Sequence, residues 1–187
     1  MPKEYETEII RYSLRSGDAI TGSIQTNLTF QTNISTFVED GMIILEDCFI
    51  INANNDSDSG TDGAFTLVYE VNVHCDLVTD SLNYDTRTDS SSNILKNIPL
   101  APCSIHGAST EHATFVATVY ADVPKAAHMD LYYTNPNLSI GIPIKNVNLR
   151  GRQIRIELKD QDGDALDAAL VAKSLFNLLI INKKLVK

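Results

Sequence analysis

Three aspartates in one short polar segment are the first residues whose types and spacing could do chemistry. Asp56, Asp58 and Asp62 lie in the segment DSDSGTD, and Ca²⁺ binds several hard oxygens presented by a flexible loop. The spacing begins like an EF-hand loop, but Gly60 stands where such a loop places a ligand, and Leu67 where it places a bidentate glutamate. We interpret this segment as a solvated loop and keep the three aspartates only as candidate calcium ligands.

A second group of carboxylates, Asp160, Asp162, Asp164 and Asp167, raises the same question near the other end of the chain. These residues surround an Asp-Gly pair, which is typical of a tight turn because Gly adopts positive φ and Asp bonds its own backbone. The turn explains these residues without a metal, so we assign no cofactor to them.

Histidine chemistry has little support in this sequence. A cupin-type metal site needs two histidines one residue apart, then a glutamate and a distant histidine. His106 and His112, the latter beside Glu111, lack this spacing. We therefore interpret them as loop or solvent-facing histidines, and we expect no metal site.

The cysteines and hydroxyl residues also lack a catalytic arrangement. Cys48, Cys75 and Cys103 are widely spaced without a CxxC pair, which predicts reduced thiols, at least two of them buried. No G-x-S-x-G nucleophile motif and no phosphate-binding glycine loop occurs in the sequence. We expect that the protein is not an enzyme and has no catalytic residues.

The elements that would position any site are strands. Ile154, Ile156 and Leu158 alternate with polar residues and then meet an Asp-Gly-Asp sequence. Alternation places successive side chains on opposite faces, so this run predicts a strand with one buried face, followed by a turn.

Similar patterns recur along the chain. We expect strands at residues 6–14, 24–34, 42–53, 64–77, 93–100, 114–123, 129–133, 138–147, 153–158 and 175–181. Residues 38–41 are typical of a turn, and residues 165–173 of a short helix or turn. Pro99 and Pro143 restrict their strands to sheet edges, strand ends or irregular positions.

This pattern predicts one all-β domain over residues 1–187, an antiparallel β-sandwich of about eight to ten strands. Long connections at residues 54–63 and 76–93 suit strands that cross between two sheets, as in a single jelly roll. One short C-terminal helix is compatible with this fold.

Composition excludes several classes of protein. A hydrophobic fraction of 43% supports a folded core, and a net charge of -9 argues against binding to duplex nucleic acid. Residues 1–10 lack the basic and apolar regions of a secretory signal, and no apolar stretch has the length of a membrane span. We expect synthesis in the cytoplasm.

Several segments, in this order, resemble the small capsid proteins of virophages, polinton-like viruses and their large double-stranded DNA relatives. An SSNILKNIPL segment ends at Leu100, and the IRIELKDQDGDALD segment runs from Ile154 to Asp167. SGDAITGSIQTNLTF and MIILEDCFIINA come earlier, and SLFNLLIINKKL comes later. The resemblance covers most of the chain by the order of its elements.

This resemblance implies a structural virion protein, either penton-like or another minor capsid subunit. Proteins of this kind are single jelly rolls without enzymatic activity, form pentamers at five-fold vertices and contact the major capsid protein. A tiling subunit needs exposed contact surfaces, and we assign these to a tyrosine-rich edge and the apolar C-terminal strand. The candidate interface residues are Leu131, Tyr132, Tyr133, Leu175, Phe176 and Leu178.

Two alternatives stay open at this point. One is a ligand-recognition β-sandwich that binds carbohydrate or a cell-surface partner, with calcium held by residues 54–63. The other is a cupin-like enzyme that uses His106 and His112.

Overall fold

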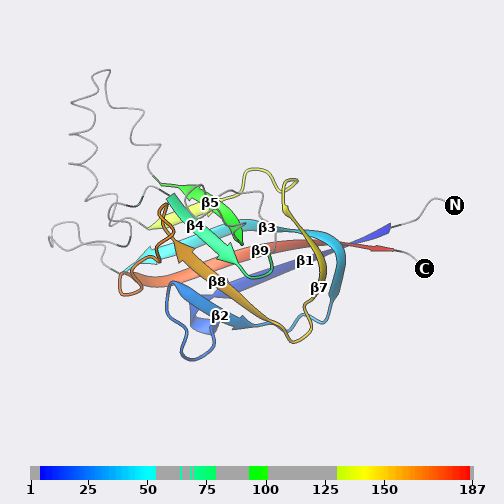
Figure 1. Ribbon diagram of the computed structural model, residues 1–187, viewed down its shortest axis with the longest axis horizontal. Coiled ribbons are helices and arrows are strands. Elements are labelled where there is room, and N and C mark those ends of the chain that lie inside the picture. Colours follow the sequence, from blue (N-terminus) through cyan, green and yellow to red (C-terminus); the bar gives the residue numbers. More distant parts are fainter. Residues whose placement is uncertain are drawn as a thin grey trace, which may run out of the picture.

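Two antiparallel sheets face each other and enclose the core (Figure 1). The computed structural model describes residues 5–53, 64, 68, 70–78, 93–100 and 130–185. The five-stranded sheet contains β1 (Tyr5–Arg15), β9 (Val171–Leu185), β3 (Phe37–Asn52), β6 (Leu131–Thr134) and β7 (Ile142–Asn148). The four-stranded sheet contains β2 (Asn27–Gln31), β8 (Gln153–Lys159), β4 (Glu70–Cys75) and β5 (Ile94–Pro99). A single turn of 3₁₀ helix, η1 (Ser16–Asp18), follows β1.

The strand order is that of a jelly roll. One sheet has the order β1-β9-β3-β6, with β7 also paired to β3, and the other has the order β2-β8-β4-β5. Among the described strands, the chain changes sheet at every connection except β4 to β5 and β6 to β7. This crossing pattern confirms the predicted single jelly-roll sandwich.

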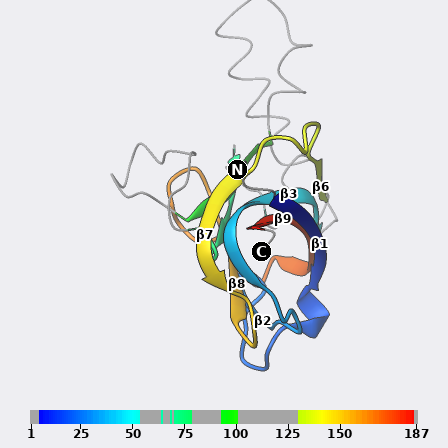
Figure 2. The same ribbon diagram turned by 90° about the vertical axis from the view of Figure 1, so that its right-hand side faces the viewer.

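The strands β6 and β7 act as one interrupted strand along the edge of β3. Residues 47–50 of β3 pair with β6, and residues 37–43 pair with β7. Figure 2 shows β7 curving along the end of the molecule beside β3. Counting β6 and β7 together gives eight strands, four in each sheet, as in a jelly roll.

Alternating apolar side chains build the core between the sheets. Ile154, Ile156 and Leu158 on β8 are buried, which confirms the predicted strand with one apolar face. Phe176 and Leu178 on β9 meet them from the opposite sheet. Burial of these side chains supplies the main driving force for folding.

The predicted turn at residues 38–41 is wrong, because these residues belong to β3. Gly41 lies where the backbone of β9 passes very close. A Cβ atom there would collide with the carbonyl oxygen of Ile181 and lie 2.9 Å from Val38 Cγ1. The glycine therefore allows close approach of two strands and does not mark a turn.

The helical alternative for residues 165–173 is also wrong. The chain forms turns at residues 168–170, and Val171 begins β9. This strand pairs with β1 on one side and β3 on the other. Ladder hydrogen bonds and burial in the centre of a sheet override the helix propensity of Ala and Leu.

The strand predicted at residues 64–77 is confirmed over part of its length, and residues 65–67 and 69 lie outside the described residues. Ala64 lies in a turn, β4 covers Glu70–Cys75, and Asp76 begins a new turn. Both faces of this strand are buried, because Asn72 and His74 are buried on the face opposite Val71 and Val73. The predicted strand 114–123 and the predicted loop 54–63 lie outside the described residues.

Both proline predictions are confirmed. Pro99 ends β5, the last described strand of its sheet, and Pro143 lies in β7, which pairs only with β3 in the described chain. None of the described helical segments could cross a membrane.

Candidate functional surfaces

Most residues with predicted metal chemistry lie outside the described part of the chain. This holds for Asp56, Asp58 and Asp62 and for His106 and His112. Within the described residues, no cluster of three or more His, Cys, Asp or Glu side chains could hold a metal ion. The calcium-assisted ligand-recognition reading and the cupin-like reading both remain predictions.

The Asp-Gly-Asp turn after β8 uses its aspartate internally. Oδ1 of Asp160 accepts hydrogen bonds from the backbone N–H groups of Asp162 (2.8 Å) and Asp164 (3.0 Å). Gly163 has φ of 84° and donates its N–H to the carbonyl of Asp160. The carboxylate of Asp160 thus closes the turn, as the sequence predicted.

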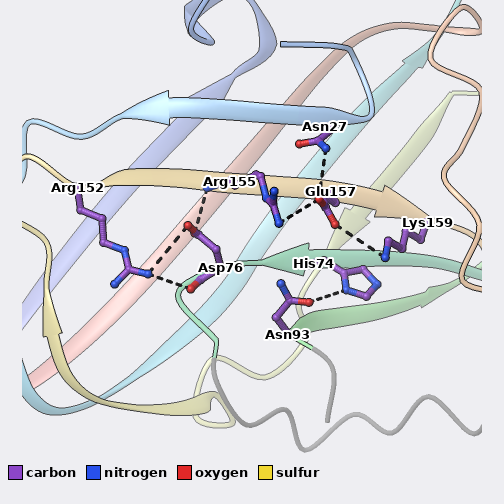
Figure 3. Close-up of polar contacts among 8 residues, drawn as sticks. All are labelled: Asn27, His74, Asp76, Asn93, Arg152, Arg155, Glu157 and Lys159. Carbon is purple, nitrogen blue, oxygen red and sulfur yellow. Dashed lines mark hydrogen bonds and ion pairs between the residues drawn. The ribbon is translucent and has the colours of Figure 1, made fainter. Parts of the chain in front are cut away.

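Polar side chains cover the outer face of the four-stranded sheet (Figure 3). The strand register places Asn27, Glu157 and His74 in one row across β2, β8 and β4. Asn27 Nδ2 donates to Glu157 Oε1 (3.3 Å), and His74 Nδ1 lies 3.0 Å from Asn93 Oδ1. Sheet pairing therefore aligns residues that are far apart in sequence.

Glu157 is the acidic centre of this row. Its Oε1 also meets Arg155 Nη2 (3.3 Å), and its Oε2 lies 3.9 Å from Lys159 Nζ. Two cations and one amide thus surround a single carboxylate, so the charge of Glu157 is balanced by its own strand.

A second polar row lies beside the first. Asn97 Nδ2 donates to Asn72 Oδ1 and to Glu70 Oε1, and Asn72 Nδ2 donates to the carbonyl of Asp160 (2.9 Å). Buried amides need such partners, because an unpaired one would lose its hydrogen bonds to water. These contacts explain how the outer face of β4 can be both polar and buried.

Asp76 continues this polar surface just after β4. Its Oδ1 accepts from the backbone N–H of Arg155 (3.0 Å), and its carbonyl accepts from Arg152 Nη2 (3.1 Å; Figure 3). The face as a whole is a network of side chains that bind one another. These contacts stabilise the outer face of the four-stranded sheet.

The outer face of the five-stranded sheet is different, because apolar side chains form rows across its strands. One row joins Leu175 on β9, Phe49 on β3 and Tyr132 on β6. The rings of Phe49 and Tyr132 pack edge to face, with centroids 6.3 Å apart. Tyr132 is 68% exposed at the β6 edge of the sheet.

A second apolar row crosses the same face toward the chain ends. It joins Ile9 on β1, Ile181 on β9, Met42 on β3 and Pro143 on β7. Ile9 is 59% exposed. Exposed apolar side chains in continuous rows, unlike scattered ones, are typical of contact surfaces.

A polar strip lies between the two apolar rows, next to the buried pair of Ile44 and Leu179. Asn177 Nδ2 donates to Asp47 Oδ1 (2.7 Å), and Ser13 Oγ lies 2.5 Å from Asn177 Oδ1. Arg11 pairs with Glu46 (3.3 Å). The face thus combines apolar side chains with a polar strip, as protein interfaces do.

The structure separates the predicted interface residues into two groups. Phe176, Leu178 and Leu131 are buried in the core, so they cannot reach a partner while the sandwich is intact. Tyr132 and Leu175 lie on the outer face, and their interface role stays a prediction. Tyr133 is half-buried, and Lys96 Nζ lies 5.6 Å from the centre of its ring.

Sequence patterns alone did not identify four apolar residues of the outer face, namely Phe49, Ile9, Met42 and Ile181. Their signal was present in Ile9 and Ile10, which are adjacent and therefore occupy opposite faces of β1. Ile10 packs against the core, so Ile9 must face outward. Where both faces of a strand are apolar, the outward face can be identified only from the register with the neighbouring strands.

The described cysteines are poor nucleophiles. Cys48 and Cys75 are free and buried, and burial raises the pKa of each thiol to about 12. Both thiols are therefore protonated at neutral pH. This confirms two buried, reduced cysteines, while Cys103 lies outside the described residues.

A small cavity lies where β6 gives way to β7. It has a volume of about 90 Å³, and its lining includes Leu95, Lys96 and Ile140. Sites for small molecules enclose roughly 300–1,000 Å³. This cavity could admit one side chain, but it is too small for a typical cofactor.

No protein-family model matches the sequence, and no curated protein matches it significantly. Its function must therefore be inferred from the surfaces described above.

Proposed function

We propose that this chain is a structural capsid subunit, penton-like or of another minor capsid type. It assembles with copies of itself and with a major capsid protein in a virion. The jelly-roll strand order supports this role, although fold alone does not determine function. The observation that carries the proposal is the apolar row of Leu175, Phe49 and Tyr132, which ends in the exposed ring of Tyr132 at the β6 edge. Leu175 and Phe49 are half-buried.

This row has the chemistry of a subunit contact. Tyr132 offers a large, stiff ring that loses little conformational entropy when it is buried, and Phe49 holds that ring from the side. Removing such a row from water on association is favourable at about 25 cal/mol for each Å² of apolar surface. A neighbouring subunit seated on the β6 edge would bury it.

The outer face of the four-stranded sheet supports the same proposal, because its polar side chains are already bound to one another. On this face, Glu157, Asn72 and Asn97 already bind neighbouring residues. A ligand would have to break these bonds and replace them. The outer face of the four-stranded sheet therefore stabilises the fold, and the outer face of the five-stranded sheet is suited to contacts with other subunits.

The proposal is tested by comparing the oligomeric state of the wild-type protein with that of a variant substituted at the β6 edge. We expect the purified protein to form a closed oligomer of five copies at high concentration, measured by native mass spectrometry and sedimentation. Tyr132→Asp should abolish the five-copy ring while circular dichroism still shows a folded protein. A charge on an exposed side chain costs the fold little, whereas the same charge buried in an interface weakens association strongly.

Ile24→Asp is the matched control. Ile24 is also an exposed apolar residue, but it lies in the β1–β2 connection, away from the row. This variant should assemble like the wild type. A chain that stays monomeric at high concentration, alone and with a major capsid protein, would refute the proposed function.

A further inference from the structure

The four edges of the two sheets differ in how well they are protected against pairing with another chain. The β2 edge is only five residues long. The β5 edge ends in Pro99 and pairs through a register shift near His74. The β6–β7 edge is interrupted and contains Pro143, and Asn146 has φ of 54°. Short strands, prolines and irregular backbone all discourage edge-to-edge association.

The fourth edge, β1, lacks these features. It has 11 residues, contains no proline and pairs with β9 without any register shift. In the described chain, β9 is its only strand partner. Alternate backbone N–H and C=O groups of β1 therefore point toward an open edge, beside the exposed side chains of Tyr5 and Ile9.

The charges on β1 are arranged with opposite signs at its two ends. Glu6 and Glu8 lie in the first half of the strand, and Arg11 and Arg15 lie in the second half. A second copy of β1 in antiparallel orientation brings each acidic half beside a basic half. The glutamates lie on the face of Ile10 and the arginines on the face of Ile9, so the attraction acts between the two halves and not through direct Glu–Arg pairs. Parallel pairing would instead place like charges together, which destabilises a sheet.

We propose that β1 of one copy pairs with β1 of a second copy as antiparallel neighbours related by a two-fold axis. A register centred on Ile10 places the outer faces of the two five-stranded sheets, one from each copy, on the same side of the joined sheet. On that face it opposes Tyr5 with Arg15, Thr7 with Ser13, and Ile9 with Arg11 in the other copy. The pairs offer a cation–π contact, a hydroxyl pair and apolar packing against an arginine stem.

This inference deepens the proposed function, because it identifies one contact between copies. It uses the edge of the sheet opposite to Tyr132. A two-fold contact at β1 and a ring contact at the β6 edge are independent, and two different symmetry operations in one subunit can close a shell.

Disulfide trapping tests both the pairing and its orientation. Two proteins are prepared in a Cys103→Ser background, one with Thr7→Cys and one with Ser13→Cys. Opposed residues in an antiparallel pair lie about 4.5–5.5 Å apart, within the reach of a disulfide. We expect the mixture to form a crosslinked dimer under mild oxidation, and each protein alone to form at least tenfold less.

Each result has a definite meaning. Crosslinking of the Thr7→Cys protein with itself would indicate parallel pairing and overturn the proposal. Equal, weak crosslinking in all three samples, with circular dichroism showing folded proteins, would also overturn it. A trapped β1 dimer in a chain that forms no ring would refute the proposed function and leave this inference standing.

Charge substitution provides a second test without cysteines. Arg11→Glu with Arg15→Glu makes β1 acidic throughout, and Glu6→Lys with Thr7→Lys shifts it toward positive charge. We expect each variant alone to dimerise at least tenfold more weakly than the wild type, and an equal mixture to recover dimers. Lys145→Glu with Arg150→Glu, which carries the same charge change near the β7 edge, should leave the β1 dimer intact. Failure of the mixture to recover would overturn the proposal.

Discussion

Gly41→Ala should destabilise the protein far more than its single added methyl group would suggest. Gly41 lies in β3, opposite Asn182 of β9. An added Cβ atom would meet the carbonyl oxygen of Ile181 well inside contact distance, lie 2.9 Å from Val38 Cγ1 and 3.3 Å from Asn182 Cα. The nearest atom belongs to the backbone of a strand that is paired on both sides, so it cannot turn away as a flexible side chain could.

The magnitude follows from the cost of overpacking. Added methyl groups in packed regions typically lower the unfolding free energy by about 1–3 kcal/mol. Because the backbone atom that the new methyl group meets is fixed, we expect Gly41→Ala to lower it by about 3 kcal/mol. In a domain of this size each kcal/mol lowers the melting temperature by about 2–4 °C, so we expect a fall of about 6–12 °C. Thermal unfolding followed by circular dichroism, together with the midpoint of urea unfolding, measures the change.

Gly17→Ala is the matched control. A Cβ atom at Gly17, in η1, would meet nothing within 4 Å. This variant should stay within about 0.5 kcal/mol of the wild type. If Gly41→Ala unfolds at the wild-type temperature, β3 and β9 do not approach each other as described, and the explanation of the glycine fails.

Three further predictions concern buried and paired groups. With Cys48 and Cys75 buried and their pKa values raised to about 12, Ellman's reagent at pH 8 should react with no more than one of the three thiols in folded protein, and with all three in urea. Phe176→Ala, which empties a fully buried site, should lower the unfolding free energy by about 3–5 kcal/mol in urea titrations. The hydrogen bond from Lys184 lowers the pKa of Glu8 below its ordinary 4.5. The wild type should therefore be more stable than Glu8→Gln above pH 4.5, and this difference should disappear as the pH falls through the lowered pKa. Unfolding midpoints of both proteins across pH 2–7 check this sign.

Local patterns predicted the elements whose two faces differ. In β8, Ile154, Ile156 and Leu158 alternate with polar residues, so the sequence alone identifies the buried face. The turn at Asp160 was predictable for a similar reason, because its hydrogen bonds join residues at most four positions apart. Local chemistry is sufficient where the partners are near in sequence.

The errors have the opposite cause. In β9, apolar residues occupy both faces, so alternation could not separate Leu175 on the surface from Phe176 and Leu178 in the core. Only the register with β1 and β3 makes that distinction. Gly41 was assigned to a turn because the residue that requires a glycine there, Ile181, is far away in the sequence.

The same reasoning explains why the contact edge that we propose could not be predicted from the sequence. Glu6, Glu8, Arg11 and Arg15 have no special meaning on a strand in the middle of a sheet, where both neighbours are fixed. Their order becomes informative only once topology places β1 at an edge and shows that the other edges carry prolines, interruptions or short strands. Because pairing at an edge needs both open backbone groups and compatible side chains, an edge that has both and lacks any protection is where a second copy should bind.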